Sequence, residues 1–449
     1  VVDEGRVLIR FWREGTARLA VLDLLDPRTL VGLDRPESGF DQLVTDGSEV
    51  ALRTASAREH PRVIRGVLTA DGALDATVLA TASESAPDPA HLSTPQAWTW
   101  TNSAGLDVHG FAYPPANADV SAPAGELPPL LVLVHGGPTS HSEPVYKAQT
   151  QYWTSRGFLV LDVNHGGGTA YGRDYRGRLT GQWGVVDIDD VVCGVRSLAD
   201  AGRTARDRVV IRGGSAGGYT VLRALTSSTV FAAGASYFGI SDLAALLVDD
   251  HKFESRYTTT LVGPWPQAEQ TYRERSPVHH IADLHGELLL LQGADDLVVP
   301  VAQAQLMADA MRDAGKDVEL VVYEGEGHGF RQASTIIDSL ERELAFYLRV
   351  FEGGPQRLLD TSRRAARTAS TAGDSPIDAR QCTSTRLVGT GSSTGTATTV
   401  EGRCPRPSLG TRATARPWAT SSTCEANSTH RKPTRGACGV AANMWLNHS

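Results

Sequence analysis

The chain has 449 residues, of which 41% are hydrophobic, and a formal net charge of -8. This length exceeds one ordinary domain and the apolar content suffices for a sizeable core, so we expect two or more domains. An acidic chain lacks the basic face that would attract nucleic acid or an anionic membrane surface. No apolar run reaches the roughly 18 residues that a membrane helix needs. We therefore expect a soluble protein that binds neither nucleic acid nor membranes.

The amino terminus and the cysteines bear on location and on metal binding. The chain begins Val1-Val2 without a basic segment followed by an apolar one, so no secretory signal is predicted, although the missing initiator Met leaves an upstream portion possible. Cys193 is the one cysteine in the well-patterned part of the chain, which is typical of a reducing compartment and favours a cytoplasmic protein. The other cysteines are widely and irregularly spaced without a C-x-x-C pair, so no metal site is predicted. They are Cys382, Cys404, Cys424 and Cys438.

Residues 1–95 contain short alternating or β-branched runs separated by turn residues, at 6–11, 17–22, 48–53 and 62–68. Such spacing is typical of antiparallel strands in a sandwich or a propeller. At about 40 to 45 residues per blade, the segment has room for about two four-stranded blades, which cannot close a ring. We predict a partial, β-propeller-like segment, either a fragment of a larger propeller or a small sheet packed on the domain that comes after it.

Residues 96–352 have the pattern of an α/β domain. A hairpin is predicted from 96–100 and 110–113, and a Pro/Ala/Gly-rich link follows over 114–129. Beyond the link, apolar strands alternate with helical patterns, as in a mainly parallel sheet that helices cover on both faces. The predicted strands are 130–134, 158–163, 208–211, 232–237, 287–291 and 318–322, and the predicted helices are 145–156, 186–201, 217–226, 301–314 and 332–350.

Residues 353–449 lose this pattern. The stretch is rich in Thr, Ser, Arg, Gly and Ala and poor in large apolar residues. It cannot bury enough apolar area to offset the entropy of ordering, so a disordered low-complexity tail is predicted. We favour an extension without selected structure over a basic interaction tail.

A glycine-flanked serine lies between a predicted strand and a predicted helix. Gly213, Ser215 and Gly217 form a G-x-S-x-G turn, the pattern of a nucleophile elbow, in which a Cβ at either glycine position would collide with the strand or the helix. The alternative is a glycine-rich turn with an unreactive serine. Its surroundings decide between the two readings.

An acid and a base follow later strands. Asp295 and Asp296 come after the strand at 287–291, and His328 comes after the strand at 318–322. Because an open parallel sheet gathers its site at the carboxyl ends of its strands, these groups are expected to meet Ser215 there. The order serine, carboxylate, histidine is that of an α/β hydrolase. The residues alone leave Asp295 and Asp296 as competing candidates for the acid.

Two further features complete the predicted site. Residues 135–138, His-Gly-Gly-Pro, follow the first strand of the α/β domain, so we assign the oxyanion donors to the backbone N–H groups of Gly137 and Ala216; a simple tight turn is the alternative. Tyr237 and Phe238 follow another strand and either line the substrate pocket or pack in the core. The glycines at 166–168 form neither a G-x-G-x-x-G nor a P-loop pattern, so no cofactor is predicted.

These residues resemble the prolyl oligopeptidase family of serine peptidases, especially its acylaminoacyl-peptidase-like and dipeptidyl-peptidase-like branches. The resemblance spans about residues 96 to 350. It implies an α/β-hydrolase fold, a propeller that restricts entry, short peptides as substrates, and Asp296 as the acid of the triad. The matching stretches are His-Gly-Gly-Pro at 135–138, Tyr-Gly-Arg at 171–173, Trp-Gly-Val-Val-Asp at 183–187, Gly-Gly-Ser-Ala-Gly-Gly at 213–218, Gly-Ala-Asp-Asp at 293–296 and Glu-Gly-Glu-Gly-His-Gly-Phe at 324–330.

The predicted function is hydrolysis of peptide bonds in short peptides through Ser215, Asp296 and His328, by way of an acyl-enzyme. The same triad would serve a carboxylesterase or lipase of this fold, which is the first alternative. The second is a non-catalytic protein or an impaired fragment, because the propeller-like segment is too short to close. The sequence makes no prediction of the oligomeric state.

Overall fold

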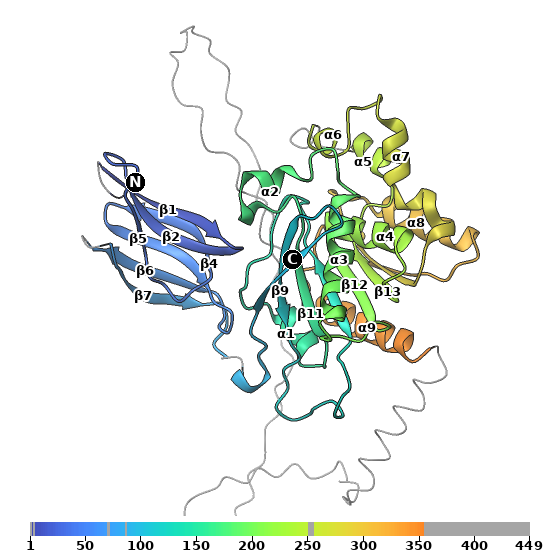
Figure 1. Ribbon diagram of the computed structural model, residues 1–449, viewed down its shortest axis with the longest axis horizontal. Helices are drawn as coiled ribbons and strands as arrows, with labels where there is room; N and C mark the ends of the chain where they lie inside the picture. The colour runs from blue at the N-terminus through green and yellow to red at the C-terminus, as the bar shows by residue number, and fades with distance from the viewer. Residues whose placement is uncertain (1, 3–4, 70–71, 86–87, 250–255, 354–449) are drawn as a thin grey trace, which may run out of the picture. The chain divides into compact units, whose positions relative to one another are not determined.

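The computed structural model describes residues 2, 5–69, 72–85, 88–249 and 256–353 (Figure 1). The tail predicted to be disordered, 353–449, lies outside the described residues except for Gly353. The β7 strand (Leu74–Thr81) ends one sheet and β8 (Gln96–Thr101) begins another, so the proposed boundary at residue 95 falls between sheets. The division into domains itself stays a prediction.

The amino-terminal segment consists of two antiparallel sheets. The first has the order β1 (Arg6–Arg13), β2 (Thr16–Asp23), β3 (Leu30–Gly32), and the second has the order β4 (Gly39–Asp46), β5 (Glu49–Ala55), β6 (Arg62–Leu68), β7. Alternate side chains of these strands are buried in one shared cluster that includes Leu19, Phe40 and Leu52. The predicted antiparallel strands are thereby confirmed, and the arrangement is that of a partial propeller.

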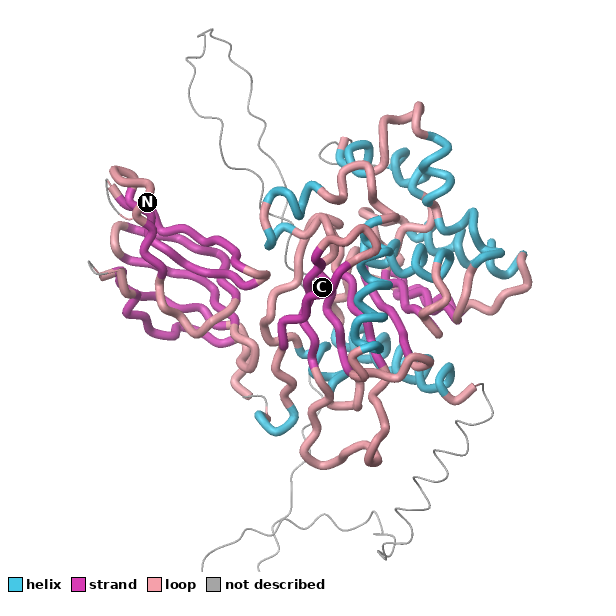
Figure 2. The backbone as a smooth tube through the Cα atoms, in the orientation of Figure 1, coloured by secondary structure: helices cyan, strands magenta, loops and turns pink. Residues whose placement is uncertain are grey.

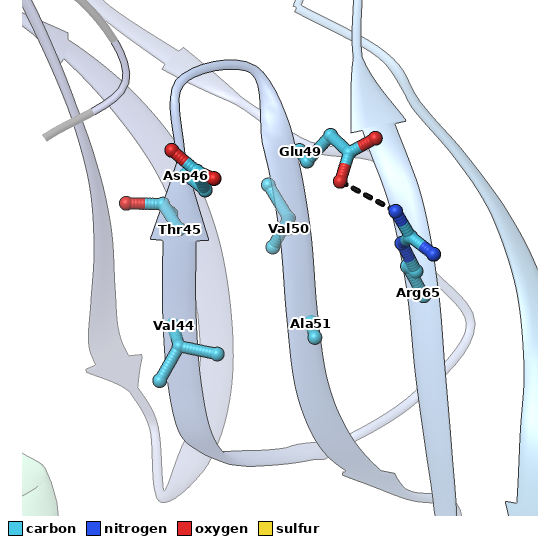
Figure 3. Close-up of a pocket in the computed structure, with 7 residues that line it drawn as sticks. All are labelled: Val44, Thr45, Asp46, Glu49, Val50, Ala51 and Arg65. Atoms are coloured by element: carbon cyan, nitrogen blue, oxygen red, sulfur yellow. Dashed lines mark hydrogen bonds and ion pairs between the residues drawn. The ribbon is translucent and has the colours of Figure 1, made fainter.

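A shallow pocket lies on the four-stranded sheet (Figure 3). Arg65 on β6 and Glu49 on β5 form an ion pair across it, with 2.7 Å between Nη2 and Oε2. None of the predicted site residues lines this pocket. The complete lining is Val44, Thr45, Asp46, Glu49, Val50, Ala51 and Arg65.

The rest of the described chain forms an α/β fold around an eight-stranded sheet of order β15-β14-β13-β12-β10-β11-β9-β8 (Figure 1, Figure 2). The strands β8 and β9 form the predicted hairpin, and β9 runs antiparallel to β11. From β10 onward the paired strands are parallel, and all six predicted strands are present. The bounds are β9 (Asp107–Tyr113), β10 (Leu130–Val134), β11 (Leu159–Asn164), β12 (Val209–Gly214), β13 (Ala233–Tyr237), β14 (Glu287–Gly293) and β15 (Glu319–Tyr323).

Two apolar cores sandwich this sheet, because successive strand residues point to opposite faces. Ile211 of β12 belongs to the core shared with α3 (Val186–Asp200), α4 (Ala216–Ser227) and α8 (Val301–Asp313). Its neighbour Val210 belongs to the other core. That core includes residues of α1 (Ala148–Thr154) and α9 (Ala333–Phe351). These five helices are the ones predicted from the sequence.

Several short elements were not predicted. Four helices of five to seven residues complete at most two turns each, which leaves little room for a helical repeat of apolar residues. Among the strands, β4 contains a register irregularity between Asp41 and Val44, and most of β7 is exposed, so neither alternates cleanly. Within the described residues, no helix combines the length and the apolar character that crossing a membrane requires. The unpredicted helices are α2 (Arg173–Gly177), α5 (Leu243–Asp249), α6 (Tyr257–Leu261) and α7 (Glu269–Arg275).

Candidate active site

Ser215 occupies a strained turn between β12 and α4. Its backbone has φ 57° and ψ -122°, a conformation that a residue with a side chain rarely adopts. A Cβ on Gly213 would lie 2.5 Å from the carbonyl carbon of Gly217, and a Cβ on Gly217 would overlap the carbonyl oxygen of Val134. The steric reason expected for both glycines is therefore present. The Ser215 N–H donates to the carbonyl oxygen of Tyr237 at 3.0 Å, which ties the turn to β13.

The start of α4 and the loop after β10 border this serine. Ala216 is the first residue of α4, where the N–H groups have no acceptor within the helix. The loop after β10 approaches from the other side: a Cβ on Gly136 would lie 3.5 Å from the Cβ of Ser215. Gly137 has φ 119°, which only glycine adopts readily. The half-buried Ser215 side chain makes no capping hydrogen bond to α4.

A pair of buried histidines supports the loop after β10. His135 Nδ1 lies 2.8 Å from the carbonyl oxygen of Gly136, and His165 Nδ1 lies 2.9 Å from that of Gly166. Because a carbonyl oxygen only accepts, each Nδ1 carries the proton. Burial, with a further contribution from His165, holds the pKa of His135 well below its ordinary value, which keeps the ring neutral. The two rings stack with centroids 4.5 Å apart.

This contact bears on the loop's backbone. The Gly136 carbonyl and the Gly137 N–H belong to one planar peptide, so the His135 hydrogen bond fixes the direction of that N–H. This role of His135 was not predicted from the sequence. The only signal was its place immediately before the two glycines.

Asp296 and His328 form a hydrogen-bonded pair. His328 Nδ1 lies 2.8 Å from Asp296 Oδ2, with the His328 side chain 22% exposed and that of Asp296 fully buried. The other carboxylate oxygen of Asp296 accepts the N–H groups of Val298 and Val299, each at 2.9 Å. Asp295 is exposed instead. Of the two carboxylates that the sequence left open, the structure brings Asp296 to the histidine.

These side chains all follow the carboxyl ends of neighbouring strands. Ser215 follows β12, Phe238 follows β13, Asp296 follows β14 and His328 follows β15. Those four strands are consecutive neighbours and run parallel, so their carboxyl ends lie together (Figure 1). Among the described residues, no three histidine, cysteine, aspartate or glutamate side chains are grouped as a metal ion would require.

Phe238 and Tyr237 have different partners, although their rings are neighbours with centroids 6.2 Å apart. The Phe238 ring centroid lies 4.8 Å from that of His328, and its backbone has φ 39°. Tyr237 is buried, and its hydroxyl donates to Glu343 Oε2 at 2.6 Å. The core-packing alternative therefore describes Tyr237. A pocket role remains a proposal for Phe238 only.

A buried ion pair lies behind the serine strand. Arg212 Nε is 3.3 Å from Glu343 Oε1, and the two side chains are 9% and 0% exposed. Tyr347 donates to the same carboxylate at 2.8 Å, and the Arg212 guanidinium lies over the Tyr237 ring at 4.6 Å. Burial raises the pKa of Glu343, an effect that the charge of Arg212 opposes. The signal that sequence reasoning missed was an acidic residue on the apolar side of the helix predicted at 332–350.

The serine turn should not tolerate a methyl group at Gly217. We expect Gly217→Ala to lower the thermal unfolding midpoint, because the new Cβ would overlap the Val134 carbonyl oxygen. Gly177→Ala in α2 is the matched control, since no atom lies within 4 Å of its added Cβ. Differential scanning fluorimetry of both variants checks the prediction. An unchanged midpoint for Gly217→Ala would show that the turn is not as tight as described.

Part of the chain is similar in sequence to known peptidases. Residues 144–354 match the prolyl oligopeptidase family of peptidases. Over 221 residues the chain is 34% identical to dipeptidyl aminopeptidase BIII of Pseudoxanthomonas mexicana, an alignment that covers 48% of this chain and 32% of that enzyme.

Solved structures give longer alignments. A puromycin-hydrolyzing peptidase of Mycobacterium tuberculosis is 42% identical with a TM-score of 0.74, over 79% of this chain and 53% of that one. A puromycin hydrolase is 37% identical with a TM-score of 0.72, over 78% of this chain and 53% of that one. The chain thus spans about half the length of these structures and about a third of the curated relative. By its sequence match over residues 144–354 and by its fold, the chain is similar to the prolyl oligopeptidase family, with an α/β-hydrolase domain preceded by propeller-like sheets.

Proposed function

We propose that the protein is a serine hydrolase that cleaves peptide bonds of short peptides, with Ser215 as nucleophile, His328 as base and Asp296 as the acid of the triad. One observation carries the proposal. A strained, half-buried serine lies at the sheet edge where a histidine is hydrogen-bonded to a buried carboxylate. A serine without an activating base is a weak nucleophile, and this arrangement supplies the base together with the group that orients it.

The first half of the reaction forms an acyl-enzyme. Because Nδ1 of His328 donates to Asp296, its Nε2 carries the lone pair that removes the Ser215 hydroxyl proton. The Ser215 oxygen attacks the carbonyl carbon, and the oxyanion is held by the N–H groups of Gly137 and Ala216. Loss of one such donor costs on the order of 3 kcal/mol of barrier. His328 then returns the proton to the leaving amine.

The second half releases the acid. A water molecule gives its proton to His328 and attacks the acyl carbon, and collapse of the intermediate restores the Ser215 hydroxyl. Asp296 keeps its hydrogen bond to His328 throughout and stabilises the imidazolium that forms twice in the cycle. Its second oxygen is held by Val298 and Val299, which keeps Oδ2 directed at the histidine.

The relatives support peptides as the substrate class. One similar protein is a dipeptidyl aminopeptidase, and a mutant of the similar puromycin hydrolase is complexed with PGG. Since the chain spans about half of that structure's length, its own activity and substrates are part of this proposal. We also propose a cytoplasmic location, supported by the free thiol of Cys193 in the α/β fold. The triad chemistry proposed here requires no cofactor.

Replacement of the nucleophile should abolish both labelling and turnover. We expect Ser215→Ala to lose covalent labelling by a fluorophosphonate probe and hydrolysis of an aminoacyl-p-nitroanilide, because the attacking oxygen is gone. Ser227→Ala is the control, since Ser227 is exposed at the end of α4. Labelling that persists in Ser215→Ala would place the nucleophile elsewhere. Turnover of a p-nitrophenyl ester without turnover of the anilide would favour the esterase alternative.

The two adjacent aspartates provide a test of the acid. Asp296→Asn should lower kcat by about 10⁴-fold, because an amide favours the wrong tautomer of the histidine. Asp295→Asn makes the same chemical change at an exposed neighbour and should leave kcat nearly unchanged. Steady-state kinetics of the two variants on the anilide decides between them. A large loss in Asp295→Asn with none in Asp296→Asn would reverse the assignment.

A further inference from the structure

Tyr237 adjoins two residues with unusual backbone conformations. Its carbonyl oxygen accepts the N–H of Ser215, which has φ 57°, at 3.0 Å. The next residue along the chain, Phe238, has φ 39°. Neither is glycine, and such conformations cost energy and persist only where the surrounding structure enforces them. The end of β13 therefore has to be held firmly in place.

The Tyr237 side chain supplies this hold through a buried polar cluster. Its hydroxyl donates to Glu343 Oε2 at 2.6 Å, and the Arg212 guanidinium lies 4.6 Å from the centre of its ring. Arg212 and Glu343 are in turn 3.3 Å apart. Hydrogen bonds inside a buried cluster are stronger than hydrogen bonds in water, because the local dielectric constant is low. Glu343 lies on α9, so the cluster couples β12 and β13 to that helix.

The same strand end also reaches the base. Phe238 is the residue after Tyr237 in the chain, and its N–H donates to the Leu291 carbonyl oxygen at 2.7 Å. Its ring packs against the imidazole of His328, with centroids 4.8 Å apart at an interplanar angle of 59°. A shift of Tyr237 would thus reach Ser215 through a hydrogen bond and His328 through the next side chain.

We propose that Tyr237 is a positioning residue that sets the geometry of both Ser215 and His328, and that Glu343 and Arg212 hold it for this purpose. The inference rests on the proposed function, which supplies the roles of the serine and the histidine. Tyr237 touches no reacting atom. It acts through its carbonyl oxygen on one side and through Phe238 on the other.

Removal of the hydroxyl should affect the chemical step more than substrate binding. In Tyr237→Phe, Glu343 Oε2 loses its donor and the strand end can relax toward ordinary backbone conformations. Because small displacements of reacting groups cost much rate, we expect kcat to fall about tenfold while KM changes less than about twofold. The second-order rate of phosphonylation of Ser215 by a fluorophosphonate should fall by a similar factor.

Tyr347→Phe is the matched control. The Tyr347 hydroxyl donates to the other oxygen of the same carboxylate at 2.8 Å and lies 3.2 Å from the Ile211 carbonyl oxygen of β12. Its own backbone belongs to α9 and not to β13, whose Tyr237 carbonyl oxygen accepts the Ser215 N–H. Both variants should lower the thermal unfolding midpoint, whereas only Tyr237→Phe should slow turnover and phosphonylation. Equal rates in the two variants, or a Tyr237→Phe enzyme with unchanged kcat and phosphonylation rate, would overturn the proposal.

Two further variants keep the outcome interpretable. If Tyr237→Phe does not fold, Glu343→Gln takes its place, since its amide oxygen can still accept from one tyrosine; it should show a smaller fall in kcat, and an unchanged kcat would count against the proposal. Ser215→Ala is measured alongside. Its loss of turnover establishes the nucleophile independently, so an unaffected Tyr237→Phe enzyme would overturn the positioning role and not the proposed function.

Discussion

The backbone of Ser215, at φ 57° and ψ -122°, persists because its neighbours leave it no room to relax. Gly213 and Gly217 bring β12 and the start of α4 so close that neither position accepts a Cβ. The N–H of Ser215 is taken by Tyr237, so the turn cannot rotate without breaking a bond to the next strand. In this conformation the side chain makes no capping bond to its own helix, and the hydroxyl is left for chemistry.

Two buried carboxylates lie near this turn, one at the carboxyl ends of the strands and one in the core. At the sheet edge, Asp296 is buried but has both oxygens occupied, by His328 and by two backbone N–H groups. In the core, Glu343 of α9 is buried beside Arg212 and two tyrosines. Burial of an ion pair costs more than it returns unless its hydrogen bonds are complete. In this protein the Arg212–Glu343 pair has such hydrogen-bond partners, and it links β12 to α9.

Long periodic elements were predictable because their pattern repeats within one sequence window. The six strands and five of the helices of the α/β fold were found in this way, and the strand-end rule then placed Ser215, Asp296 and His328 together. The short helices α2, α5, α6 and α7 left no such pattern. Choosing between Asp295 and Asp296 depends on how the loop after β14 turns, which the residues alone did not determine.

Tyr237 and Phe238 illustrate the same limit on a finer scale. Phe238 lies just beyond the end of β13 and its ring meets His328, whereas the Tyr237 hydroxyl meets Glu343. The sequence shows two adjacent aromatic residues, but it does not show which of them contacts His328 and which contacts Glu343. The burial of Glu343 was not predicted for a related reason: the sequence of a helix of mixed polarity does not show which of its acidic residues is buried.

The central claim, that Ser215 is a nucleophile served by a preformed oxyanion site, is tested most directly by a crystal structure of the protein inhibited with a fluorophosphonate. The account predicts a covalent bond from Ser215 Oγ to phosphorus, with the phosphoryl oxygen within hydrogen-bonding distance of the N–H groups of Gly137 and Ala216. An adduct on another residue, or a phosphoryl oxygen directed away from both N–H groups, would contradict it.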